Sequence, residues 1–296
     1  MTRPAKTAEG ESTNIQPKDR AISPLLRWAG GKQFLLPHLL RSLPSNWEVL
    51  DYCEPFLGAG SLFFALAPRN AVLGDANPHL IQFYRTITRN PAGVSKALGT
   101  HRTLGSKRHY YLVRGLYNRG TPGAAQGARF LYLNKSCFNG IFRVNRLGQF
   151  NVPYGERAKP QLPSLDVLSR ASSALKRARL VRASFERTLS LVRKPTFIYL
   201  DPPYPALSHT SFFAHYTRER FTELDQARLA ASWNELDALG CPLLMTNADT
   251  PLIRRLYRGM YFQQIPVVRY VSGGANKAVV RDLIITNYKL PTPGSM

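Results

Sequence analysis

The sequence predicts an α/β fold in which a helical insertion interrupts a doubly wound sheet. A short apolar run, a glycine turn, a helix start and a second apolar run follow one another over 47–75, as in the first half of such a sheet. From about Leu80 to about Pro163 the strand signals stop and the chain becomes basic. Strand and helix patterns resume after Leu165, so the insertion divides one sheet-forming domain. With 296 residues and 44% hydrophobic content, the chain can bury a large core.

The elements before the insertion follow from the spacing of apolar residues. Residues 1–20 show no such periodicity and are expected to form a disordered tail. Four apolar side chains at helical spacing predict a helix over 33–43, which Pro44 ends. These four are Phe34, Leu35, Leu39 and Leu40. The next expected elements are a buried strand over 47–52, a tight turn at 58–60, a helix start at 61–67 and a strand over 71–74 that ends at Asp75.

The elements after the insertion alternate between helical and strand-like patterns. A strongly apolar, β-type run over 196–200 is the clearest strand signal. Helical spacing over 222–239 predicts a long helix, with Gly240 as its stop. The other expected elements are a helix over 165–178 and strands over 179–183, 242–246, 261–270 and 282–287.

Positive charge is concentrated in and just after the insertion. The chain carries 40 Lys and Arg against 18 Asp and Glu, a formal net charge of +22. Residues 101–195 hold 19 of these cations against three carboxylates, a net of +16. A merely solvated surface would mix the two signs, so the excess predicts a polyanionic partner, nucleic acid in preference to an anionic membrane surface. Aromatic residues interleave with these cations, which suits base stacking beside phosphate contacts.

Cysteine spacing and hydropathy exclude several protein classes. Cys53, Cys137 and Cys241 are too few and too irregularly spaced for a disulfide framework or a zinc site, so no metal is expected. No apolar run approaches the ~20 residues that cross a bilayer, and residues 1–20 lack a signal-peptide stretch. A cytoplasmic protein without membrane partners is therefore expected.

The glycine turn and the carboxylate after it suggest a cofactor site. Gly58 and Gly60 follow a strand, where glycine lets the backbone approach a ligand at the carboxyl end of a sheet. Asp75 ends the next strand and can accept hydrogen bonds from ribose hydroxyls. A structural turn and a capping or turn aspartate are the alternative interpretations. The chain has no phosphate-loop motif, so a nucleoside triphosphate is not expected.

The tetrapeptide Asp201-Pro202-Pro203-Tyr204 is the most informative motif. Its two prolines remove two backbone donors and fix φ, so the turn offers a carboxylate and carbonyls as acceptors. Acceptors of this kind suit an exocyclic amine, because holding its hydrogens favours a more pyramidal and more nucleophilic nitrogen. Tyr204 adds a face on which a base can stack. A proline-rich strand exit with a core tyrosine is the alternative interpretation.

Three motifs in a fixed order carry a resemblance to one family. They are Arg27-Trp28-Ala29-Gly30-Gly31-Lys32, Glu54-Pro55-Phe56-Leu57-Gly58-Ala59-Gly60 and Asp201-Pro202-Pro203-Tyr204. Each motif alone is weak, but their combination is specific. Over roughly 22–288 the chain resembles the Dam-type, alpha-group adenine-specific DNA methyltransferases, and the segments 132–145 and 148–155 are similar to that family's target-recognition segment.

The resemblance implies a class I S-adenosylmethionine-dependent methyltransferase fold, a Rossmann-like mixed sheet with a reversed last strand and a helical target-recognition insertion. It implies a catalytic domain in two parts, 21–79 and 163–290, and a DNA target-recognition domain at 80–162. Tails are expected at 1–20 and 291–296.

The resemblance also implies S-adenosyl-L-methionine as the cofactor. Asp201 is expected to lie near the methionyl end and engage the target amine, Pro202 to offer its carbonyl and Tyr204 to stack on a flipped adenine, with Pro203 completing the catalytic motif. The residues implied for cofactor binding are Trp28, Lys32, Glu54, Phe56, Gly58, Gly60, Asp75 and Asp201.

DNA contacts are implied within the insertion and at the first motif. Phe138 and Asn139 match positions that probe the disturbed helix and the orphan base, while Arg143 matches one that reads guanine, for which arginine is geometrically suited. Phe138 stands where related enzymes often have tyrosine, so a hydroxyl is absent while the wedge is kept. The residues implied for DNA binding are Arg27, Phe138, Asn139, Ile141, Arg143, Asn145 and Pro153.

The expected function is methyl transfer from S-adenosyl-L-methionine to N6 of a flipped adenine in duplex DNA, at GATC or a related site, by a monomer. Alternatives left open are methylation of another planar amine, such as cytosine N4, RNA adenine or a glutamine side chain, and a catalytically inactive DNA-binding protein. The enzyme is expected either to share its site with a cognate restriction endonuclease or to act alone.

Overall fold

The computed structural model describes residues 22–28, 30–32, 34–156, 159–205, 221–270 and 277–290. The tails expected at 1–20 and 291–296 lie outside these described residues.

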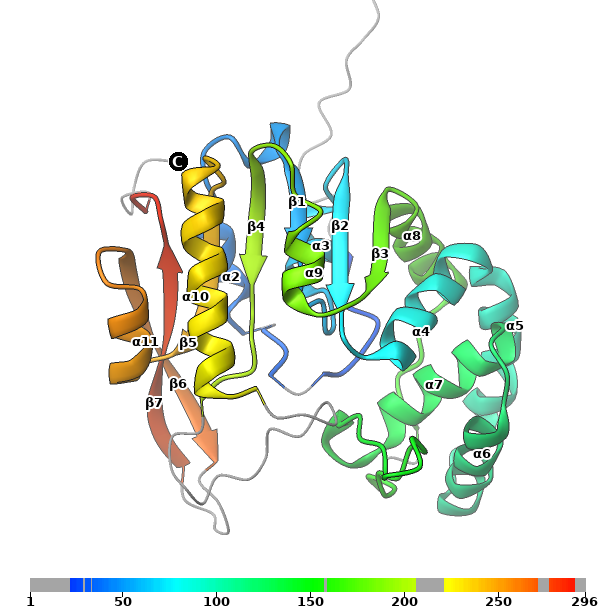
Figure 1. Ribbon diagram of the computed structural model, residues 1–296. Helices are drawn as coiled ribbons and strands as arrows, with labels where there is room; N and C mark the ends of the chain where they lie inside the picture. Colours follow the sequence, from blue (N-terminus) through cyan, green and yellow to red (C-terminus); the bar gives the residue numbers. More distant parts are fainter. Residues whose placement is uncertain are drawn as a thin grey trace, which may run out of the picture.

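A seven-stranded sheet with the order β3-β2-β1-β4-β5-β7-β6 forms the centre of the molecule (Figure 1). The strands are β1 Asp51–Glu54, β2 Ala71–Asp75, β3 Ala178–Arg182, β4 Thr196–Leu200, β5 Leu243–Ala248, β6 Tyr261–Tyr270 and β7 Lys277–Thr286. The first five pair in parallel, whereas β7 runs antiparallel to both β5 and β6. This confirms the α/β fold with a reversed last strand. Strand order changes direction between β1 and β4, which is where open α/β sheets bind ligands.

The helices form two groups around this sheet. Those outside the insertion are α2 Leu36–Arg41, α3 Ser61–Leu66, α8 Leu165–Leu175, α9 Phe185–Leu189, α10 Glu223–Ala238 and α11 Pro251–Leu256. The other helices are α4 Pro78–Arg89, α5 Pro91–Thr103, α6 Lys107–Arg119 and α7 Ala124–Ser136. Figure 1 shows this second group beyond the β3 edge of the sheet, so the basic insertion is helical as predicted.

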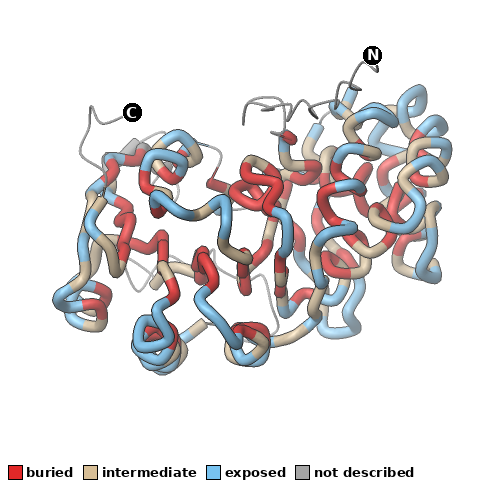
Figure 2. Tube along the Cα trace, turned by 90° about the horizontal axis from the view of Figure 1, so that it is seen from above, coloured by how far each residue is buried: buried red, intermediate tan, exposed pale blue. Residues whose placement is uncertain are grey.

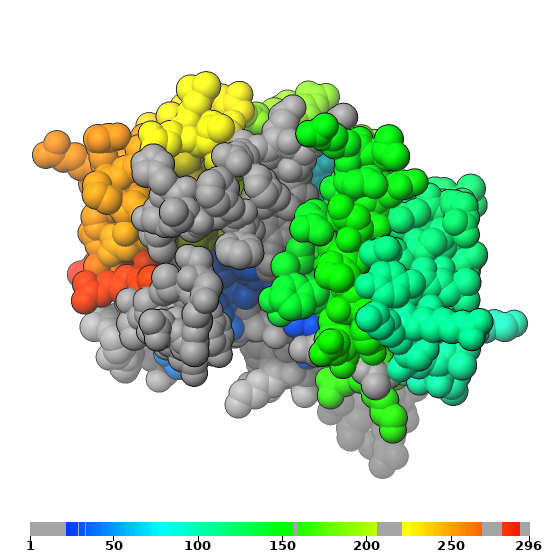
Figure 3. Space-filling model, turned by 90° about the horizontal axis from the view of Figure 1, so that it is seen from below, coloured from blue at the N-terminus to red at the C-terminus, as the bar shows by residue number. Residues whose placement is uncertain are grey.

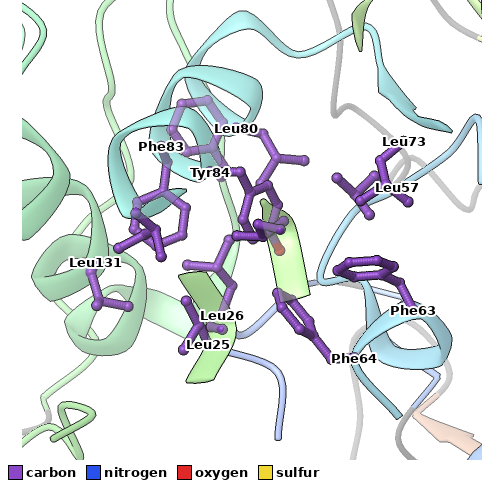
Figure 4. Packing of buried hydrophobic residues seen from close by; sticks show 14 of the residues in the cluster. Leu25, Leu26, Leu57, Phe63, Phe64, Leu73, Leu80, Phe83, Tyr84 and Leu131 are labelled. Carbon is purple, nitrogen blue, oxygen red and sulfur yellow. The ribbon is translucent and has the colours of Figure 1, made fainter. Parts of the chain in front are cut away.

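Two apolar clusters cover the two faces of the sheet. One packs α9, α10 and α11 around Trp233. The other joins the opposite face to α3, α8 and the insertion helices, and Figure 4 shows Leu25 and Leu26 lying between Phe64 of α3 and Leu131 of α7. Figure 2 shows the buried stretches along the strands and the inner sides of the helices. The segment after Ile22 is therefore part of the core and is anchored on both sides.

Some predicted boundaries are wrong. Residues Trp47–Val49 form a 3-10 turn, closed by hydrogen bonds back to Pro44 and Asn46, and the strand begins only where β1 meets its partners. The helix expected over 33–43 is limited to Leu36–Arg41, with Phe34 and Leu40 exposed, because only Leu35 and Leu39 of its stripe face the core.

The strand expected over 282–287 begins earlier, at Lys277, because antiparallel pairing with β6 extends the ladder. The strand over 196–200 is confirmed residue for residue, and the helix over 222–239 is confirmed with Thr222 as its cap. The short helices α9 and α11 were not predicted, since each is only five or six residues long.

Candidate active site

Acidic side chains from three neighbouring strands gather at the carboxyl edge of the sheet. Glu54 ends β1, Asp75 ends β2 and Asp201 directly follows β4. Side chains alternate along a strand, so Asp201 shares a sheet face with Tyr199. Figure 3 views the molecule from this edge, where the blue N-terminal segment lies recessed beside the green residues of the insertion.

Asp201 and Lys32 form the centre of the site. Lys32 Nζ lies 2.7 Å from Asp201 Oδ1, and Thr246 Oγ1 donates a hydrogen bond of 2.7 Å to the same oxygen. Lys32 also donates to the Gly30 carbonyl at 2.7 Å and lies 4.5 Å from the centre of the Tyr204 ring. The Lys32 and Asp201 side chains are only 8% and 19% exposed, so removing either partner would leave a largely desolvated charge. The first and third motifs therefore meet in space.

The second motif forms a turn that requires glycine. Gly58 and Gly60 have φ of 47° and 65°, in the left-handed region that side chains disfavour. A Cβ on Gly58 would lie 3.0 Å from the Trp28 ring, which also stacks on Phe142 at 6.0 Å. The first motif thus packs directly against the turn of the second.

Asp75 holds this turn. It accepts hydrogen bonds from the backbone N–H groups of Gly58 at 3.0 Å and Asn77 at 2.8 Å, one on each oxygen. Asn77, rather than Asp75, caps α4. Desolvation raises the pKa of Asp75 to about 6, while these two hydrogen bonds oppose the shift. These two hydrogen bonds are those of a turn aspartate, the alternative interpretation of Asp75. Each carboxylate oxygen can still accept a second hydrogen bond.

Burial favours the protonated form of Glu54 over the charged form. Glu54 is buried, and Tyr52 donates a hydrogen bond of 2.7 Å to its Oε2. Burial raises the pKa of Glu54 well above its ordinary value, and the charges of Asp201 and Asp75 add to the effect. A protonated Glu54 can donate a hydrogen bond as well as accept one.

Phe56 belongs to an aromatic cluster beside the turn. Its ring stacks on Phe185 at 5.5 Å and meets Phe221 edge-on at 5.8 Å. Neither partner was predicted from the sequence. The available sign for Phe185 was an aromatic residue two positions after the strand expected over 179–183.

Apart from Arg27, the residues expected to contact DNA lie on a short antiparallel hairpin between Cys137 and Tyr154. Bridges pair Cys137 with Tyr154 and Val144 with Phe150. Phe138 is 51% exposed, and its N–H donates to the carbonyl of Pro153 at 3.0 Å.

Polar side chains along the hairpin form hydrogen bonds within it. Asn139 is exposed and has a φ of 53°. Arg143 is exposed and donates from Nε to Asn151 Oδ1 at 2.9 Å. Asn145 accepts hydrogen bonds from the N–H groups of Leu147 and Gln149, both at 3.0 Å. Ile141 packs at the edge of the core.

A two-way clamp joins the first motif to the insertion. Arg27 N–H donates to Asn134 Oδ1 at 2.8 Å, and Asn134 Nδ2 donates to the Arg27 carbonyl at 2.6 Å. A Cβ on Gly140 would lie 2.6 Å from Arg27 Cβ, so the backbone approach requires glycine there. Asn134 was not singled out in the sequence, because an asparagine inside a helix has no distinguishing local pattern.

The structure thus brings together Lys32, Asp201 and Tyr204, and joins Trp28 to the glycine turn. It leaves Phe138, Asn139 and Arg143 exposed on the hairpin. Among the described residues, no group of three His, Cys, Asp or Glu side chains could hold a metal ion. Within the same part of the chain, no helix is long and apolar enough to cross a membrane.

Comparison with known proteins gives consistent matches over most of the chain. A family model described as D12 class N6 adenine-specific DNA methyltransferase matches residues 28–272. The chain is 34% identical over 276 residues to Type II methyltransferase M1.LlaDCHI of Lactococcus lactis subsp. cremoris, covering 90% of this chain and 96% of that protein. It is 36% identical over 271 residues to a DNA adenine methylase of Vibrio cholerae, with coverages of 90% and 95%. Type II methyltransferase M.MjaIII of Methanocaldococcus jannaschii is 31% identical over 287 residues, with coverages of 90% and 99%.

Proposed function

Because the chain belongs to the D12 class N6 adenine-specific DNA methyltransferases, we propose that it transfers methyl from S-adenosyl-L-methionine to an adenine flipped out of duplex DNA, at GATC or a related site. The family fixes the fold as class I, the substrate as DNA and the modified atom as adenine N6. The donor, the flipping step, the sequence and the residue roles are the proposal. The observation that carries it is the convergence of Lys32, Asp201 and Tyr204 at the switch point of the sheet.

The residues at the glycine turn fit S-adenosyl-L-methionine. The left-handed turn at Gly58 and Gly60 brings bare backbone to the strand end, and the Trp28 ring lies against it. Asp75 has oxygen capacity left for ribose hydroxyls. Lys32, Glu54 and Phe56 complete the proposed cofactor site in the roles the family resemblance assigns.

At the target end, the chain's own groups prepare the amine. When bound, S-adenosyl-L-methionine supplies an electrophilic methyl group on a sulfonium sulfur. Asp201 and the Pro202 carbonyl accept the hydrogens of the adenine amine and raise the nucleophilicity of its nitrogen. Lys32 covers one face of Tyr204, so the flipped adenine stacks on the other. Pro203 fixes the backbone between them.

The hairpin supplies sequence recognition in this proposal. Phe138 and Asn139 enter the space the flipped base leaves, and Arg143 reads a guanine in the major groove. Asn145, Ile141, Pro153 and Arg27 contribute the remaining DNA contacts.

We expect a monomeric cytoplasmic enzyme. Because two of the relatives are named type II methyltransferases, the proposal includes a cognate restriction endonuclease that acts on the same site.

The test is methyl transfer from labelled S-adenosyl-L-methionine to duplexes that contain GATC, a scrambled site, or GATC with the adenine replaced. Label confined to the GATC adenine supports the methyl donor, the modified base and the recognition site. Label on other adenines moves the recognition site, label on cytosine contradicts the base, and tight DNA binding without label supports an inactive binder.

A further inference from the structure

The residue that orients the Asp201 carboxylate lies on the neighbouring strand. We propose that Thr246 is a positioning residue, which holds Asp201 Oδ1 so that Oδ2 is left to accept the target amine. This inference rests on the proposed role of Asp201.

Strand register brings the two residues together. Leu200 of β4 pairs with Met245 of β5, so the next residue on each strand, Asp201 and Thr246, are neighbours across the sheet. Thr246 is fully buried, and its hydroxyl lies 2.7 Å from Asp201 Oδ1. A β-branched side chain inside a sheet has few χ1 choices, so this hydroxyl is held firmly in place.

The direction of the hydrogen bonds follows from counting protons. A threonine hydroxyl carries one proton, and Thr246 donates it to Asp201. Tyr199 OH lies 3.2 Å from the same hydroxyl, so it must donate to Thr246. Burial keeps the pKa of Tyr199 well above its ordinary value, and Tyr199 therefore stays a donor. The result is a relay from Tyr199 through Thr246 to one oxygen of Asp201.

The two oxygens of Asp201 are used differently. Lys32 and Thr246 both engage Oδ1. Within the described part of the chain, no donor engages Oδ2. Pro202 and Pro203 fix the backbone that leaves the strand, but a backbone does not set χ1 of Asp201. Lys32 also serves the proposed cofactor site, so Thr246 is the anchor of Asp201 that does not depend on the cofactor.

The variant Thr246→Val removes the hydroxyl at nearly constant shape. We expect kcat for DNA methylation to fall about 10- to 100-fold, because a misdirected carboxylate no longer holds the amine. The dissociation constant for DNA should stay within about twofold, since Thr246 is fully buried and cannot contact DNA. Thr246→Ser restores the donor and should recover most of kcat.

Thr196→Val is the matched control. Thr196 is also buried, lies at the opposite end of β4, and donates to the Lys194 carbonyl at 2.9 Å. It should keep wild-type kcat. An unchanged kcat in Thr246→Val, or a failure of Thr246→Ser to recover, would overturn the inference.

Two further measurements separate this inference from the proposed function. A crystal structure of Thr246→Val shows the orientation of the Asp201 carboxylate, whether or not the variant is active. An unmoved carboxylate would refute the positioning role. If that variant does not fold, Tyr199→Phe removes the donor behind Thr246 and should lower kcat about threefold, whereas no change refutes the relay. Wild-type protein that methylates no duplex would instead defeat the proposed function.

Discussion

At the scale of the residue, the Asp201–Lys32 pair concentrates charge in a poorly solvated place. The two groups lie 2.7 Å apart and are mostly shielded from water. A charge-assisted hydrogen bond is both shorter and stronger than a neutral one, so it fixes the relative position of the first and third motifs. A change to the charge of Asp201 should therefore also alter the position of Lys32.

The variant Asp201→Asn tests whether methyl transfer requires the negative charge of Asp201. The amide keeps the shape of the side chain and can still accept from Thr246, but it loses the charge. We expect kcat to fall at least about 10²-fold while DNA affinity changes only a few fold. Filter binding and labelled methyl transfer measure the two quantities. Asp166→Asn, on the exposed first turn of α8, is the control. Retained turnover in Asp201→Asn would end the assigned role.

Asp75 predicts a pH dependence of cofactor affinity. Its pKa is raised to about 6, from an ordinary 3.8, so between these values the folded protein holds a proton that the unfolded chain has released. The free energy of unfolding should therefore fall as pH rises through this window. Ribose hydroxyls bind the ionised form best, so the dissociation constant of S-adenosyl-L-methionine should rise as pH falls below about 6. Titration calorimetry of S-adenosyl-L-methionine binding at pH 5.5, in two buffers of different ionisation enthalpy, should detect release of a proton on binding. An Asp75→Asn variant with the same pH slope would assign the effect to another group.

The residues that the sequence could reveal are those inside motifs. Gly58 and Asp201 each sit in a local pattern whose chemistry can be interpreted without coordinates, whereas Lys32 was identified through the family resemblance. Thr246 and Asn134 act through partners 45 and 107 positions away, respectively, and such contacts depend on strand register and helix docking. No local pattern carries that information.

At the scale of the element, the hairpin between Cys137 and Tyr154 carries the side chains that we propose recognise the DNA sequence. Its exposed side chains are ordered by bonds within the hairpin itself, such as the one from Arg143 Nε to Asn151. That bond uses the Nε donor of the guanidinium and not its two terminal nitrogens, which we propose contact a guanine. Asn151 therefore orients the guanidinium group of Arg143.

Arg143→Ala should relax one base pair of the recognition site. A bidentate arginine–guanine contact contributes about 1–3 kcal/mol of discrimination, so binding to the cognate duplex should approach that of the single-substitution duplex. Competition binding against duplexes substituted at each position measures this. Arg146→Ala, an exposed arginine on the same hairpin, should weaken all duplexes equally or not at all. Equal weakening by Arg143→Ala would make it a phosphate contact.

Elements were predicted well where burial and periodicity agree, and poorly where they do not. The strand over 196–200 is buried at every position, and the long helix after Thr222 has a capping box. Trp47–Val49 is apolar enough to resemble a strand, yet its backbone N–H groups donate to the carbonyls of Pro44 and Asn46 and form a 3-10 turn instead. Short-range hydrogen bonding overrode the apolar pattern there.

At the scale of the whole molecule, positive charge is concentrated in the part of the chain that we propose binds DNA. The net +16 over residues 101–195 covers much of the insertion and the return to the sheet. The remaining residues carry 21 Lys and Arg against 15 Asp and Glu, a net of only +6. A duplex would therefore be drawn to one side of the protein before any base is read.

DNA affinity should fall steeply with salt. If the basic region neutralises six or more phosphates, raising salt from 50 to 200 mM should weaken binding by about 10³-fold. Fluorescence anisotropy with a duplex that lacks the site measures this term alone. A shallow dependence would show that few of these cations contact phosphate.

The clamp between Arg27 and Asn134 also has a consequence for enzyme engineering. It ties the start of the sheet domain to α7, so a recognition domain transplanted from a relative must bring an amide at position 134 and glycine at 140. A graft that exchanges only the hairpin after Cys137 leaves the amide in place, though it must still supply that glycine. Chimaeras with junctions on either side of the hairpin should therefore fold more readily than those cut within α7, which makes this seam the natural place to exchange specificities.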